Sequence, residues 1–142
     1  MKKFLVCFCV ICMIFSMGTV AFAFSGEIIV ESESNDSISE ANNVQIMSSK
    51  SYHVVGVVSK DDKEDWFKVN PIKTGEGFFN LDEGAGIDCS IYLYDENGRL
   101  IASGRRDIDH IYISSNSVYY VKVKYDSGAS KNEPYKLQIT VI

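Results

Sequence analysis

Short runs in which apolar and polar residues alternate fill the chain from residue 52 to its end. In one of them, Tyr119, Val121 and Val123 fall on one side and Tyr120 and Lys122 on the other, which is the two-residue period of a half-buried β-strand. The eight predicted strands are residues 52–59, 65–70, 77–82, 88–95, 99–103, 110–114, 118–125 and 135–142.

The turns between these runs favour strands that pair with their neighbours. Asn97-Gly98 is the clearest, because Asn-Gly readily adopts the positive φ angles of a tight hairpin, so strands 88–95 and 99–103 are predicted to pair antiparallel. Residues 37–44 are predicted to form at most two helical turns, and no crossover helix follows. The fold class predicted is all-β, an antiparallel, jelly-roll-like β-sandwich.

The first 23 residues have the features of a signal peptide. Lys2 and Lys3 precede an apolar run that is short for a membrane span, and Ala21 and Ala23 supply the small residues of a cleavage site. We therefore expect an exported, extracellular protein with no membrane insertion after cleavage. The remainder is predicted to comprise an acidic segment at residues 24–36 and one sandwich domain at residues 37–142.

The charge of the chain limits the classes of partner that it can bind, and its cysteine content limits the disulfides that it can form. The formal net charge is −5, and loss of the two leader lysines makes the exported chain more acidic, which argues against nucleic acid and anionic membranes but suits hard cations. Three of the four cysteines lie in the leader, so no disulfide is expected within the exported chain. Cys89 shares its strand phase with Ile91 and Leu93, which predicts burial.

Catalytic chemistry has little support. His53 and His110 are the only histidines, and neither belongs to a nucleophile motif, a zinc-ligand spacing or a phosphate-binding loop. We therefore expect a protein that is not an enzyme and holds no zinc.

Several segments together resemble a known family. They are ESESND at residues 31–36, DDKEDWFKV at 61–69, IYLYDENG at 91–98, VYYVKV at 118–123 and PYKLQI at 134–139. In this order they resemble the bacterial pre-peptidase C-terminal domain and the collagen-binding domains of clostridial collagenases, which share its fold. The resemblance covers residues 31–142 and implies a non-catalytic jelly-roll module of the kind usually attached to secreted peptidases.

Two acidic segments form a candidate metal site. Calcium takes six to eight oxygen ligands, and closely alternating carboxylates and amides supply them when such a segment is extended. A solvated acidic linker beside a polar turn is the alternative for the same residues. The resemblance favours calcium, because the collagen-binding relatives bind it with an E-x-E-x-N-D segment and two aspartates before the next strand. The residues that match are Glu31, Glu33, Asn35, Asp36, Asp62 and Asp65.

Four tyrosines form a candidate ligand-binding surface. They are out of phase with the apolar residues of their strands, so they are predicted to face solvent on one sheet and to stack on a sugar ring or pack against a protein rod. The collagen-binding relatives grip the triple helix with exposed tyrosines, which favours this role. Aromatic side chains buried at strand ends are the alternative, and the phase of Trp66 is left open. The four residues are Tyr92, Tyr94, Tyr112 and Tyr120.

The function predicted is a secreted, calcium-stabilised binding or targeting module for an extracellular protein or matrix ligand. Two alternatives remain open at this point. One is a carbohydrate-binding module, because the same tyrosine surface suits glycans. The other is a separate accessory or chaperone-like domain for a secreted peptidase.

Overall fold

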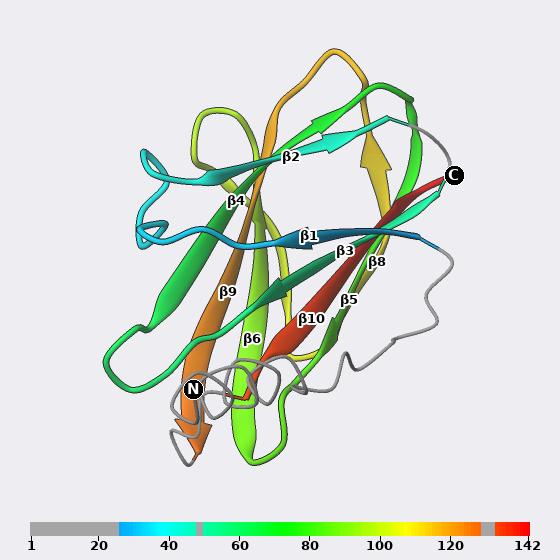
Figure 1. The fold of residues 1–142 in the computed structure, drawn as a ribbon. Helices are drawn as coiled ribbons and strands as arrows, with labels where there is room; N and C mark the ends of the chain where they lie inside the picture. Colours follow the sequence, from blue (N-terminus) through cyan, green and yellow to red (C-terminus); the bar gives the residue numbers. More distant parts are fainter. Residues whose placement is uncertain (1–25, 48–49, 129–132) are drawn as a thin grey trace, which may run out of the picture.

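The computed structural model describes residues 26–47, 50–128 and 133–142. They form two five-stranded sheets that pack face to face (Figure 1), in the orders β1-β3-β10-β5-β8 and β2-β4-β9-β6-β7. The strands are β1 (Gly26–Val30), β2 (Asn42–Ile46), β3 (Ser51–Gly56), β4 (Glu64–Pro71), β5 (Gly75–Asp82), β6 (Ile87–Tyr94), β7 (Leu100–Gly104), β8 (Asp107–Ile113), β9 (Tyr119–Gly128) and β10 (Tyr135–Val141). The expected β-sandwich is confirmed.

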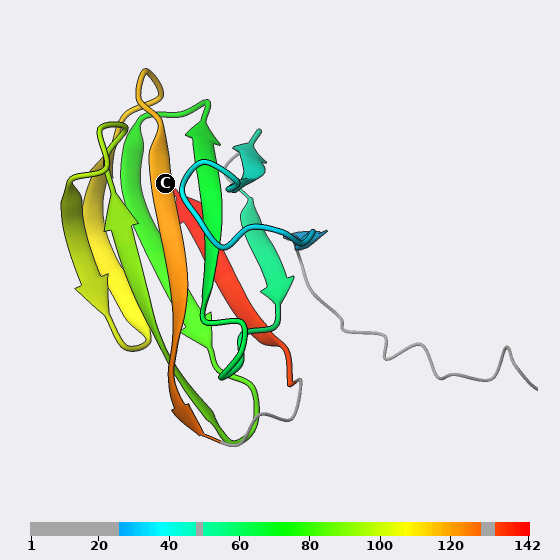
Figure 2. The ribbon, with the colours of Figure 1, turned by 90° about the vertical axis from the view of Figure 1, so that its left-hand side faces the viewer.

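The eight predicted strands correspond to β3 to β10, with ends that differ by at most three residues. β9 and β10 occupy the centres of their sheets, and Figure 2 shows them in orange and red along the length of the molecule. The Asn97-Gly98 hairpin is present, since β6 and β7 pair antiparallel and Gly98 has a φ of 76°. The Asp95 carboxylate accepts hydrogen bonds from the backbone N–H groups of Asn97 and Arg99, both at 2.9 Å, which fixes the turn.

Two strands were not predicted, and each pairs parallel with its neighbour. β1 lies in the acidic segment at residues 24–36, which was expected to precede the sandwich domain, and it pairs with β3. β2 lies where two helical turns were expected, so that prediction is wrong; it pairs with β4. Val44 and Ile46 of β2 are fully buried, and this tertiary burial outweighs the helical preference of the residues before them. The sheets are therefore mixed rather than wholly antiparallel.

The core follows from strict alternation along the central strands. In β4, β6 and β10, and in β9 as far as Val123, every second residue is buried, and Phe67, Ile91, Val121 and Leu137 are fully inaccessible. Burying each such side chain contributes about 1.5–3 kcal/mol. Cys89 is buried as predicted, and desolvation, followed by the nearby Glu83 charge, raises the pKa of its thiol to about 12. The thiol is therefore a core group that stays protonated.

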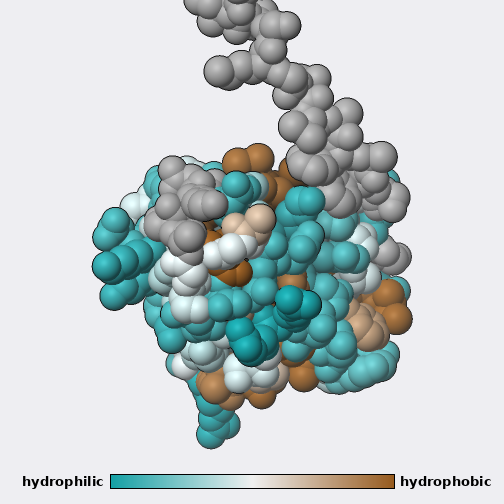
Figure 3. Space-filling view, turned by 90° about the horizontal axis from the view of Figure 1, so that it is seen from below, coloured by the Kyte–Doolittle hydropathy of each residue, from teal (hydrophilic) through white to brown (hydrophobic). Residues whose placement is uncertain are grey.

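The surface at one end of the sandwich is mainly hydrophilic. Figure 3 shows this end, where hydrophobic residues form only small, separate patches. Among the residues that the structure describes, no helix has the length and apolar character needed to cross a membrane. The predicted signal peptide at residues 1–23 lies outside the described residues and stays a prediction.

Candidate functional site

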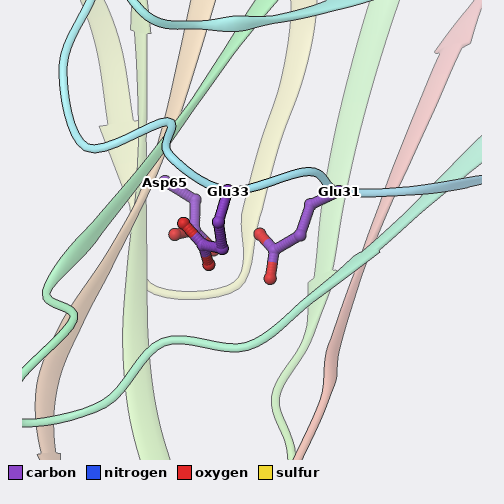
Figure 4. Close-up of side chains that lie close together, drawn as sticks. All are labelled: Glu31, Glu33 and Asp65. Carbon is purple, nitrogen blue, oxygen red and sulfur yellow. The ribbon is translucent and has the colours of Figure 1, made fainter.

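The two predicted acidic segments meet at the start of β4. The connection from β1 to β2 carries Glu31, Glu33 and Asp36, the β3–β4 loop carries Asp62, and Asp65 is the second residue of β4. One carboxylate oxygen from each of Glu31, Glu33 and Asp65 lies within 4.8 Å of the other two, and the same holds for Glu33, Asp36 and Asp62. Figure 4 shows Glu33 and Asp65 against one another, with Glu31 turned towards the same space. Glu33 belongs to both groups.

Backbone hydrogen bonds hold the β1–β2 connection in place. The Glu31 N–H donates to the carbonyl of Val55 at 3.0 Å, which extends the pairing of β1 with β3 by one residue. Farther along, the Trp66 N–H donates to the carbonyl of Asn35 at 2.9 Å, which joins the connection to β4. The acidic segment is thus bonded to both sheets, and it presents its carboxylates towards the β3–β4 loop.

Asp65 faces the interior of the sandwich. It shares its strand phase with Phe67 and Val69, and its side chain is fully buried. The Tyr135 hydroxyl donates to Asp65 Oδ2 at 2.6 Å and to Glu31 Oε2 at 3.3 Å. Tyr135 is the first residue of β10, so this hydroxyl connects the acidic cluster to the central strand of the opposite sheet.

Several buried polar atoms of the cluster lack a protein partner. Asn35 is fully buried, yet neither its amide oxygen nor its amide nitrogen is hydrogen-bonded to any described residue. Asp62 Oδ1 and Asp65 Oδ1 are likewise buried and unpartnered within the described part of the chain. An unsatisfied buried polar group costs about 1–3 kcal/mol. The three free oxygens, together with the surrounding carboxylates, form the all-oxygen donor set that a hard cation such as calcium prefers.

The raised pKa values of the cluster also favour a bound cation. Burial, followed by the neighbouring Glu31, raises the pKa of Asp65 to about 9, although the Tyr135 hydrogen bond opposes the shift. Burial and then the charges of Glu33 and Asp36 raise the pKa of Asp62 to about 7. These carboxylates disfavour one another's charge, and a bound divalent cation would remove that repulsion.

The metal-free protein is expected to lose stability as the pH rises from about 5 to about 9. The folded state holds a proton on Asp65 up to a pKa of about 9, whereas its ordinary pKa is 3.8. The resulting stabilisation is complete below the lower value and is lost as the pH approaches the higher one. Urea unfolding in the presence of a chelator measures this trend. A free energy of unfolding that increases over this range would contradict it.

Three of the four predicted tyrosines share one surface. Tyr92 and Tyr94 of β6 and Tyr120 of β9 lie on the outer face of the β2-β4-β9-β6-β7 sheet, and Tyr94 is directly opposite Tyr120. Tyr112 is the most exposed of the four at 74%, but it lies on β8 in the other sheet, so its assignment to this face is corrected. Alternation within a strand gives the phase of a side chain, and it does not give the sheet to which the strand belongs.

Trp66 belongs to the same outer face and was not predicted there. Its ring centroid lies 5.1 Å from that of Tyr94, with the planes tilted by 34°. Its phase with Glu64 and Lys68 was the available indication, because two charged neighbours mark the outer side of a strand. Trp66, Tyr92, Tyr94 and Tyr120 are called the aromatic platform below.

The two histidines are not brought together. His53 lies on β3 and His110 on β8, and β10 and β5 separate these strands. His110 Nδ1 lies 2.7 Å from the Glu76 carboxylate on the exposed surface.

Comparison with known proteins supports the fold. No family model matches the chain, and neither does any curated protein. Among solved structures, the chain is similar to the pre-peptidase C-terminal domain of a collagenase from Bacillus anthracis. The TM-score is 0.53 at 19% sequence identity, and the match covers 71% of this chain and 95% of that domain.

Proposed function

Because the chain shares its fold with the pre-peptidase C-terminal domain of a bacterial collagenase, we propose that it is a non-catalytic extracellular binding module stabilised by calcium. Similarity in fold is not similarity in ligand, so the metal and the binding role are argued from the residues of this chain.

The observation that carries the proposal is that Glu33 belongs to both groups of carboxylates. It contributes to two groups of three carboxylates, and Asp62 and Asp65, each of which has a buried unpartnered oxygen, belong one to each group. Two calcium ions with Glu33 between them would give those oxygens a partner. The residues that would hold calcium are Glu31, Glu33, Asn35, Asp36, Asp62 and Asp65.

Calcium at this position would have a structural role. When bound, it supplies the positive charge that lets neighbouring carboxylates remain ionised together. The cluster joins the β1–β2 connection to the β3–β4 loop, and through Tyr135 it contacts β10. The ion would therefore fix β1 and the acidic connection against the sandwich, which couples binding to folding.

The aromatic platform is the proposed ligand-binding surface of the exported protein. Tyrosine and tryptophan offer large contact areas at a low entropic cost. A matrix protein or a glycan fits such a surface. The domain from Bacillus anthracis belongs to a collagenase, so an accessory role beside a secreted peptidase is a second candidate.

Isothermal titration of the metal-free protein with calcium chloride tests the metal proposal. We expect two ions to bind per chain, one for each carboxylate group. Glu33→Gln is expected to weaken binding by at least about tenfold, because it removes a charge from both groups. Glu96→Gln is the matched control, since Glu96 is also exposed but lies in the β6–β7 turn. Absence of calcium binding to the unaltered protein would overturn the proposal.

A further inference from the structure

The aromatic platform is arranged in two rows across the three central strands of its sheet. In the first row Trp66 of β4 and Tyr92 of β6 flank Lys122 of β9. In the next row Tyr120 of β9 lies beside Tyr94 of β6. Trp66 approaches Tyr94 across β9, so these two rings form a strip over the middle of the sheet.

Lys122 lies among the rings of the platform and contacts three of them. Its ammonium lies 5.1 Å from the Trp66 ring centroid, 4.8 Å from that of Tyr92 and 5.9 Å from that of Tyr94. Its side chain is only 13% exposed, and its Nζ is 3.2 Å from Glu64 Oε1. The other oxygen of Glu64 accepts the Trp66 indole N–H at 3.3 Å. The cation–π contacts and the ion pair fix the rings before any ligand arrives, which lowers the entropic cost of binding.

The polar groups around the rings suit a hydroxyl-rich ligand. The indole of Trp66 and the phenol of Tyr94, inclined by 34° and each partly exposed, can offer their accessible ring surface to the C–H face of a sugar ring. Glu64 and Lys122 lie beside that surface and provide an acceptor and donors for hydroxyl groups. A protein interface is typically depleted of charge at its core, whereas the centre of this strip is an ion pair. These features favour a glycan over a protein.

The charge of the face favours a neutral glycan over an acidic one. Lys122 is paired with Glu64, and Lys124, on the same face, is paired with Asp126 at 3.7 Å. The whole molecule has a formal net charge of −5, which repels polyanions. An anionic polysaccharide or a nucleic acid would require a surplus of cations at the contact.

We propose that the strip formed by Trp66 and Tyr94, with the Lys122–Glu64 pair beside it, binds a neutral polysaccharide. This inference rests on the proposed binding role of the aromatic platform and names its ligand class.

Affinity electrophoresis of the purified full chain with calcium tests the proposal. The gels contain soluble neutral polysaccharides (hydroxyethyl cellulose, glycol chitin, xylan, a β-1,3-glucan or amylose), and parallel gels contain polygalacturonate. We expect at least one neutral polysaccharide to retard the protein, and polygalacturonate to retard it less. Retardation by none of the neutral polymers, or stronger retardation by polygalacturonate, would overturn the proposal.

Variants locate the contact. Trp66→Ala is expected to reduce the affinity for the retarding polysaccharide at least about tenfold, whereas Tyr112→Ala, an exposed tyrosine of the other sheet, leaves it unchanged. Equal losses in both variants would contradict the assigned strip. If Trp66→Ala does not fold, Tyr94→Ala removes the other ring, and the same loss is expected.

The calcium proposal has its own readout. A protein that binds calcium, and is retarded by immobilised collagen but by no neutral polysaccharide, would refute the glycan inference while leaving the proposed function intact. A protein that binds no calcium but is retarded by a neutral polysaccharide would refute the metal proposal while leaving the glycan inference intact.

Discussion

Saturating calcium is expected to raise the midpoint of thermal unfolding by roughly 10 °C. A ligand at about one hundred times its dissociation constant that binds only the folded state adds about 2.7 kcal/mol to the free energy of unfolding. The unfolded chain does not hold the β1–β2 connection beside Asp62 and Asp65, so it lacks the site. In a domain of this size each kcal/mol raises the midpoint by about 2–8 °C.

Differential scanning calorimetry with calcium, with magnesium and with a chelator measures this effect. The chelator is expected to remove the whole increase. Magnesium is expected to give a smaller increase, because it demands a tighter octahedral shell and gives up its water reluctantly. Glu33→Gln is expected to lose most of the calcium-dependent shift, whereas Glu96→Gln retains it. An unchanged midpoint in calcium and chelator would remove the proposed stabilising role.

The sandwich could be predicted from sequence because its central strands are amphipathic in a regular way. In β6, β9 and β10 every buried position holds an apolar or aromatic residue, so the two-residue period is unambiguous. β2 has only Val44 and Ile46 as buried residues, and β1 buries little of its own surface. Two apolar positions are too few to define a period, and both strands depend on a parallel partner distant in the sequence.

The candidate metal centre was identified by residue type and order, but its geometry was not available from sequence. Asp65 is an acid at an inward position of β4, in phase with Phe67, so its strand contradicts the usual pattern. Only the fold shows that Tyr135, seventy residues away, donates to it. The ambiguity of Trp66 has the same origin. Asp65 on one side of the strand and Trp66 on the other favour opposite assignments, and only the charges of Glu64 and Lys68 indicate that the Trp66 side faces outward.

Gly56→Ala is expected to weaken calcium binding at least about tenfold. Gly56 ends β3, and a Cβ added there would overlap the Glu31 carboxylate and the Tyr135 hydroxyl. The Tyr135 ring is fully buried, so the more mobile Glu31 carboxylate must move. That movement would break its 2.6 Å hydrogen bond from the Val57 N–H and shift one oxygen ligand. The metal-free protein is also expected to lose about 1–3 kcal/mol of stability.

Gly98→Ala separates this local effect from the general cost of replacing a glycine. Gly98 has a φ of 76°, so alanine there strains the backbone by about 1 kcal/mol. A Cβ at that position meets nothing closer than 3.9 Å, and the β6–β7 turn contributes no residue to the cluster. Gly98→Ala should therefore lower the unfolding midpoint without changing calcium affinity, as measured by titration calorimetry. Calcium affinity in Gly56→Ala equal to that of the unaltered protein would show that the Glu31 carboxylate is not a ligand, since the added methyl group cannot be accommodated without displacing it.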